Sequence, residues 1–85
     1  MRRTDVTYGQ LDKVLRRFGF SCRDLKDKPR VRVYEHKPTG AAFVLPAFPL
    51  SDRVLDYHLI GVRTSLDLYG IADPRQFAAK LKKAG

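Results

Sequence analysis

Two histidines are the side chains of this chain best suited to acid–base chemistry, because imidazole ordinarily titrates near neutral pH. His36 follows Arg32 and Tyr34 at alternate positions. A histidine beside a cation could act on a hydroxyl group or a leaving group, so His36 is the candidate catalytic residue. A histidine that flanks a turn without an evident partner is more typical of a surface position. His58, next to Tyr57, fits a solvated or partner-contacting residue.

The other reactive side chains indicate no metal or cofactor site. Cys22 is the only cysteine, which excludes an internal disulfide and a cysteine-based zinc site, and it fits a half-buried strand residue. Asp24 and Asp27 alternate with Lys26 and Lys28, so we expect these carboxylates to neutralise neighbouring charge rather than hold a cation. The sequence contains no glycine-rich phosphate loop and no nucleophile elbow. We therefore expect no metal and no cofactor.

Positive charge is the clearest functional signal in the composition. The chain has a formal net charge of +8, and residues 1–40 carry 11 basic and 5 acidic side chains, against 6 and 4 in residues 41–85. Such a charge favours polyanions, because every neutralised phosphate releases counterions, although solubility alone is a simpler explanation. The predicted nucleic-acid-binding residues are Arg16, Arg17, Arg23, Lys26, Lys28, Arg30 and Arg32. They would form one surface if the end of the first helix met the loop before the second strand. In a fold of the double-stranded-RNA-binding kind, such a surface suits the backbone of an A-form duplex, so RNA is the expected partner.

The helix that carries the first of these cations has clear boundaries in the sequence. Thr7 and Gln10 form a capping-box pattern, and Gly19 supplies a left-handed stop. The apolar side chains between them recur with the period of a helix: Leu11, Val14, Leu15 and Phe18. We predict a helix that begins at Thr7 and ends before Gly19.

Three strands are predicted after this helix. The first covers residues 20–25, a loop covers residues 26–29, and the turn at residues 37–40 joins residues 30–36 to residues 41–46 in a hairpin. Pairing His36 with Ala41 places Tyr34 opposite Phe43 and Val33 opposite Val44.

This register separates two faces of the hairpin. Tyr34, Phe43 and Leu45 are expected beneath the helices, with Arg32 and His36 reaching out at the rim. The opposite face carries Val31, Val33 and Val44, together with Glu35 and Ala42. This face would be unusually apolar for an exposed surface, so the three valines are the predicted interface for a protein partner or a second copy of the chain. The alternative is that residues 46–50 cover it.

Two further helices are predicted. Ser51 is a good N-cap for a long amphipathic helix that ends at Gly70, and Gly61 in its middle suggests a close approach to another backbone. Asp73 should cap a last helix that begins at Pro74.

Helix, three antiparallel strands, long helix and short helix define an α+β fold with the helices on one face of the sheet, as in double-stranded-RNA-binding domains. At 85 residues the chain is expected to be one domain, residues 1–85. Met1-Arg2-Arg3 is not followed by an apolar segment, and no run approaches the ~20 apolar residues of a membrane helix. We expect no membrane association and a cytoplasmic location.

The residues also resemble a family, the HicA (YcfA-like) messenger-RNA-cleaving toxins of bacterial toxin–antitoxin pairs, which have this fold. The matching pieces span most of residues 7–72. They are Phe18-Gly19-Phe20, Tyr34-Glu35-His36, Gly40, Val44-Leu45-Pro46, Val62-Arg63-Thr64-Ser65-Leu66 and Gly70-Ile71.

The resemblance implies a ribonuclease whose catalytic histidine lies in a Gly-Ser-His stretch, three residues before an aromatic residue. Counting back from Tyr34 gives Val31, preceded by Pro29-Arg30, so the family's imidazole is missing. Val has no proton to give or accept. The chain also lacks the basic start that RNA-binding domains of this fold have on their long helix, since Ser51-Asp52-Arg53 is nearly neutral.

Three functions remain open from the sequence. The first is an RNA-binding domain without the family's hydrolytic residue. The second is an active ribonuclease toxin that uses His36 or another arrangement. The third is a protein-interaction module, whose partner would be an antitoxin-like protein or a second copy of the chain.

Overall fold

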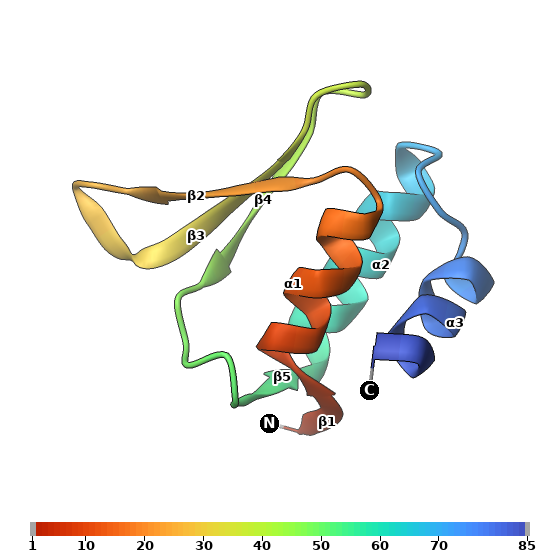
Figure 1. Ribbon diagram of the computed structural model, residues 1–85, viewed down its shortest axis with the longest axis horizontal. Helices are drawn as coiled ribbons and strands as arrows, with labels where there is room; N and C mark the ends of the chain where they lie inside the picture. Colours follow the sequence, from red (N-terminus) through yellow and green to blue (C-terminus); the bar gives the residue numbers. More distant parts are fainter. Residues whose placement is uncertain (1, 85) are drawn as a thin grey trace.

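The computed structural model describes residues 2–84, so the first and last residues of the predicted domain lie outside the described part. Five strands and three helices follow one another along the chain (Figure 1). In order, they are β1 (Arg3–Thr7), α1 (Tyr8–Arg17), β2 (Ser21–Leu25), β3 (Lys28–His36), β4 (Ala41–Pro46), β5 (Arg53–Leu55), α2 (Asp56–Leu68) and α3 (Pro74–Ala84). The fold is α+β, as the sequence predicts, with a three-stranded antiparallel sheet in the order β2-β3-β4 and a two-stranded sheet of β1 and β5.

The first helix is confirmed together with its cap. The backbone N–H of Gln10 donates to the Thr7 hydroxyl at 3.1 Å, and the N–H of Thr7 donates to the Gln10 side chain at 2.8 Å. Two otherwise unpaired donors of the first turn are thereby satisfied. Gly19 ends the turn after the helix with a φ of +95°, a conformation that L side chains rarely adopt.

The predicted register of the β3–β4 hairpin is confirmed. His36 pairs with Ala41, Tyr34 with Phe43, and Val33 with Val44. Strand β2 pairs with the other edge of β3, so that Cys22 lies opposite Tyr34, and a bulge falls between Asp24 and Leu25. The loop between β2 and β3 is shorter than predicted, because β3 already begins at Lys28.

The start of the long helix was predicted wrongly. Ser51 does not cap it; Arg53–Leu55 forms β5, which pairs with β1, and α2 begins at Asp56 after Leu55, which makes no side-chain capping hydrogen bond. The Asp52 carbonyl accepts from the N–H of Tyr8 at 2.9 Å, so this segment is tied to the start of α1.

Helices α1 and α2 lie against one face of the three-stranded sheet, α1 beside β2 and α2 beside β4, and α3 packs on the two helices (Figure 1). The buried core joins all these layers through Leu11 and Leu15 of α1, Tyr34 of β3, Leu66 of α2 and Phe77 of α3. The predicted close approach at Gly61 is wrong, because a Cβ placed there would meet nothing within 4 Å.

The last helix has the cap that the sequence predicts. The N–H of Gln76 donates to the Asp73 carboxylate at 2.8 Å, and the N–H of Asp73 donates to the Gln76 side chain at 2.9 Å. This reciprocal pair fixes the first turn of α3, and Phe77 and Leu81 then turn inward onto the other helices.

Candidate nucleic-acid interface

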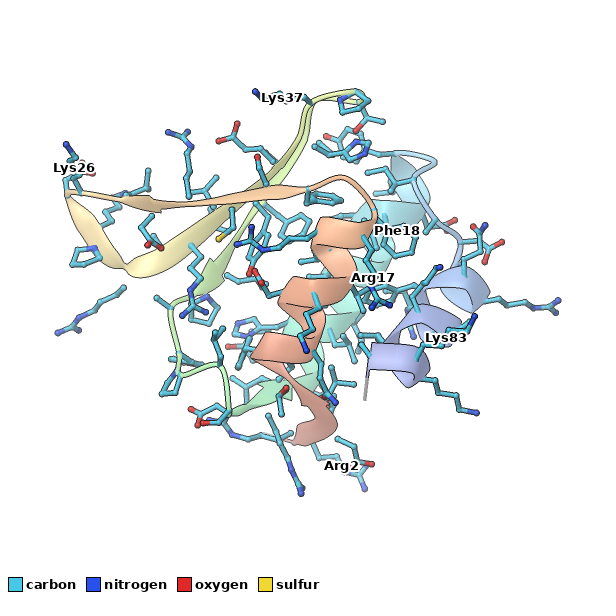
Figure 2. The ribbon with its side chains drawn as sticks, viewed as in Figure 1. Arg2, Arg17, Phe18, Lys26, Lys37 and Lys83 are labelled. Atoms are coloured by element: carbon cyan, nitrogen blue, oxygen red, sulfur yellow. The ribbon has the colours of Figure 1, made fainter. Side chains whose placement is uncertain are left out.

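The tip of the β2–β3 hairpin concentrates exposed cations. Lys26, Lys28 and Arg30 are all exposed there, and among residues 2–84 none of them is in a salt bridge. The hairpin extends away from the helices, with Lys26 at its far end (Figure 2). These side chains reach solvent, and two exposed carboxylates, Asp24 and Asp27, lie in the same hairpin.

Three of the other predicted binding residues are engaged within the protein. Arg16 Nε donates to Asp12 Oδ2 at 2.9 Å, and Arg23 Nε forms an ion pair with Glu35 across the strands. Arg32 is half-buried rather than extended at the rim, and its Nη2 donates to the Phe48 carbonyl at 3.1 Å. These cations retain their charge, but reorienting them toward a phosphate would cost existing hydrogen bonds.

A second group of cations lies where α1 and α3 pack against each other. On α1, Lys13 and Arg17 are exposed four residues apart, on the same side of the helix. Figure 2 places Arg17 on the flank of α1 that is turned toward α3. The exposed cations of α3 are Arg75, Lys80, Lys82 and Lys83, and α3 contains no acidic residue from Pro74 to Ala84.

The two groups do not form the single surface that the sequence predicts. That surface required the loop before β3 to meet the end of α1, but α1 leads into the start of β2, whereas this loop follows the other end of β2. The five residues of β2 separate them by roughly 17 Å at about 3.4 Å per residue. The candidate interface therefore consists of a hairpin tip and a separate α1–α3 face.

The α3 lysines were not among the predicted binding residues. Their position in the sequence predicts that they stabilise the C-terminal end of a helix through its dipole, and Lys82 and Lys83 do lie in the last turn of α3. Their distance from α1 in the sequence hides the packing that brings the two helices together. The absence of acidic residues along the whole helix was the available signal.

A partly buried hydrogen bond joins α1 to the sheet. The Tyr34 hydroxyl donates to Asp12 Oδ1 at 2.8 Å, while Asp12 Oδ2 accepts from Arg16. Burial, and then the bond to the Asp12 carboxylate, raises the pKa of Tyr34 well above its usual value, so the hydroxyl remains a donor at neutral pH. Burial also raises the pKa of the neighbouring Cys22 thiol, which disfavours a reactive thiolate.

His36 is buried, not exposed at the rim as the sequence suggested. The side chain is 8% exposed, its ring centroid lies 5.0 Å from that of Phe20, and its Nδ1 lies 2.8 Å from the Thr39 hydroxyl. The Thr39 oxygen also accepts from the N–H of Ala41 at 3.2 Å. The imidazole stabilises the β3–β4 turn, and this packing leaves it little room to meet a substrate.

His58 is the second imidazole and lies half-buried on α2. Its Nδ1 is 2.9 Å from the Tyr8 hydroxyl, which accepts from the N–H of Leu55 at 3.4 Å, and burial lowers the pKa of His58 below its usual value. It lines a hollow of about 200 Å³ between β4 and α2. The sequence singled out His58 but not this contact with Tyr8, because the two residues are 50 positions apart.

The predicted valine face has no cover from the connection after β4. Residues 46–50 pass along the helix side of the sheet instead, where the Phe48 ring lies 5.6 Å from the Tyr8 ring and the Leu50 carbonyl accepts from the N–H of Gly9. Val44 is 56% exposed, whereas Val31 and Val33 are half-buried. Only Val44 among the three predicted interface residues is thus broadly exposed.

A larger hollow of about 610 Å³ lies between α3 and the β1–α1 segment, lined largely by Val6, Ala78, Ala79 and Leu81. It contains no histidine or cysteine and lies apart from the hairpin tip. Within residues 2–84 no three histidine, cysteine, aspartate or glutamate side chains gather in a way that could hold a metal ion. None of the described helices has the length and apolar character needed to cross a bilayer.

No family model, curated protein or solved structure matches the chain. The HicA-like assignment therefore stays a prediction from the short motifs quoted above, and the geometry of the described residues carries the functional argument.

Proposed function

We propose that this chain is an RNA-binding domain that contacts the sugar-phosphate backbone of an A-form duplex and does not cleave it. The observation that carries the proposal is the β2–β3 tip, where Lys26, Lys28 and Arg30 are exposed outside any salt bridge among the described residues. Duplex RNA is recognised mainly by its shape and its phosphates, so a protein needs spaced cations rather than a base-reading pocket.

The separation of the basic regions supports a duplex rather than a compact anion. The tip and the end of α1 are roughly 17 Å apart along β2, too far to hold one phosphate but suited to two backbone segments of a duplex. Lys13 and Arg17 on α1, with the lysines of α3, would supply the second contact. The Tyr34–Asp12 hydrogen bond holds α1 at a fixed position relative to the hairpin.

The chemistry around the imidazoles supports binding over cleavage. His36 is packed against Phe20 and bonded to Thr39, and His58 is bonded to Tyr8. The position that the resemblance assigns to the catalytic histidine is Val31. General acid–base cleavage needs a group that titrates near the working pH and reaches the reacting hydroxyl, and neither histidine is arranged with a second such group.

The test measures the affinity of a short RNA duplex over a range of salt concentrations for the wild type and for Lys26→Ala/Lys28→Ala. Each lysine that neutralises a phosphate contributes about one to the slope of log K against log salt, so the variant should lose about two from this slope. The matched control is Lys37→Ala/Arg63→Ala, which removes the same charge from exposed positions outside the proposed interface. The slope for this control should equal the wild-type slope, apart from the small decrease that any loss of net positive charge causes.

Three results would overturn the proposal. Absence of salt-dependent binding to the duplex would exclude a phosphate contact, and equal losses in the two double variants would exclude the hairpin tip. Cleavage of the RNA in the same samples, abolished by His36→Ala or by His58→Ala, would show the chain to be a ribonuclease.

A further inference from the structure

A stripe of exposed apolar residues runs along α2. Tyr57, Ile60 and Leu68 are 49%, 49% and 80% exposed, and with Gly61 and Thr64 they recur at helical spacing on one side of the helix. The buried residues of α2, Val62 and Leu66, lie on the opposite side. A helix normally turns its polar side to water, so this second apolar side has no role in the core of the chain.

Strand β4 is a sheet edge that no charged side chain protects, and its one proline, Pro46, lies at its last position. It lies at one end of the order β2-β3-β4 and contains no charged residue. The opposite edge, β2, carries Arg23 and Asp24, charges that discourage pairing with another chain. An uncharged edge strand exposes backbone donors and acceptors that a further strand can pair with.

The stripe and the edge lie on the same side of the molecule. Helix α2 packs beside β4 and α1 beside β2, and Tyr57 and Gly61, from the apolar side of α2, line the hollow between α2 and β4. Val44 and Tyr57 line the same hollow between β4 and α2, which joins the two features into one surface. We call this surface, formed by Val44, Tyr57, Ile60 and Leu68, the β4–α2 surface.

We propose that the β4–α2 surface binds a second copy of the chain, with β4 pairing antiparallel to β4 of the other copy about a twofold axis. Two copies would then form a continuous six-stranded sheet, with the two α2 helices side by side beneath its centre. The same apolar residues would meet their equivalents across the axis, as an isologous interface requires. This inference goes beyond the proposed RNA binding and does not depend on it.

The distribution of charge favours a second copy as the occupant. The chain carries +8, and two such molecules repel each other over most of their surfaces. Helix α2 has two aspartates and one arginine, and β4 has no charge, so this surface lacks the positive excess of the rest of the chain. Two copies can therefore approach here with little repulsion, whereas an acidic protein partner would be drawn to the hairpin tip and to the α1–α3 face.

The test is sedimentation equilibrium of the full chain over a range of concentrations. Wild type should be a dimer, and Ile60→Lys should be a monomer because a charge at the centre of the interface would have to be buried. Leu50→Lys is the matched control: it adds the same charge at a residue that is 51% exposed, close to the 49% of Ile60, but outside the β4–α2 surface. It should leave the dimer intact, and circular dichroism should show both variants folded.

Hydrogen exchange provides a second readout that separates the two sheet edges. In the dimer the amides of β4 should exchange more slowly than those of β2, and this difference should disappear in Ile60→Lys. A wild type that is monomeric at every concentration would overturn the proposal. Equal dissociation of the dimer by Ile60→Lys and by Leu50→Lys would also overturn it. A dimer that is broken by Val33→Lys but not by Ile60→Lys would place the interface on the open face of the sheet instead.

Discussion

Removing the Tyr34 hydroxyl should weaken the attachment of α1 to the sheet. Tyr34 is 2% exposed, and its ring stacks on Phe43 at a centroid distance of 5.7 Å, so Tyr34→Phe preserves the packing and deletes only the hydrogen bond to Asp12. A hydrogen bond to a charged group contributes about 1.5–3 kcal/mol to stability. Asp12 keeps its bond to Arg16, and its side chain is 19% exposed, so water can replace part of the loss. We expect a loss of about 1.5 kcal/mol, at the lower end of this range.

Thermal and urea unfolding measure this change directly. For a domain of this size, about 1.5 kcal/mol corresponds to a decrease in Tm of roughly 6–12 °C. Tyr69→Phe is the matched control, because Tyr69 is 50% exposed and its hydroxyl forms no hydrogen bond within residues 2–84, so its effect should stay within about 0.5 kcal/mol. If Tyr34→Phe costs no more than the control, the hydrogen bond does not hold α1 in place, and the fixed spacing between α1 and the hairpin loses its structural basis.

Two further predictions concern backbone strain and titration. Gly19→Ala should destabilise the fold by more than about 1 kcal/mol, because the φ of +95° is strained for alanine and the new Cβ would lie 3.3 Å from His36 Nε2. Gly61→Ala, in the open middle of α2, should instead stabilise the fold by about 0.5–1 kcal/mol. Urea unfolding checks that the two changes in stability have opposite signs. The pKa of His58 is lowered by burial, so the unfolded chain binds the proton more readily and stability should fall as pH decreases below about 6.5. His58→Gln should flatten this part of the curve, and a slope unchanged from wild type would contradict the assignment.

Patterns within short segments of the sequence correctly predicted the parts of the fold that depend on neighbouring residues. The capping boxes of Thr7 and Asp73 and the register of the β3–β4 hairpin depend on residues a few positions apart, and all were correct. The β1–β5 pair depends on segments about 50 residues apart, short and without alternating polarity, so no window of the sequence contains it. This pairing also explains the error at Ser51, since tertiary hydrogen bonds to α1 prevail over its preference for a helix N-cap.

The candidate site was predicted less completely, because charge in the sequence does not reveal contacts in the fold. Lys26 and Lys28 are exposed, as a binding surface requires, but the Arg32 side chain donates to the Phe48 carbonyl. His36 was expected at the surface because it flanks a turn and has no evident partner in the sequence; its contact with Phe20 arises from packing between segments distant in the sequence.

The hairpin tip proposed for RNA and the β4 edge proposed for self-association are different parts of the three-stranded sheet. The hairpin tip follows β2, one edge of the sheet, whereas the proposed dimer forms through β4, the other edge. A twofold dimer would leave both tips outside the contact, because neither β2 nor the β2–β3 turn takes part in the β4–β4 pairing. The segregation of charge allows both associations at once: the cations that attract phosphates lie away from the contact between copies, and the nearly neutral β4–α2 surface has little attraction for RNA.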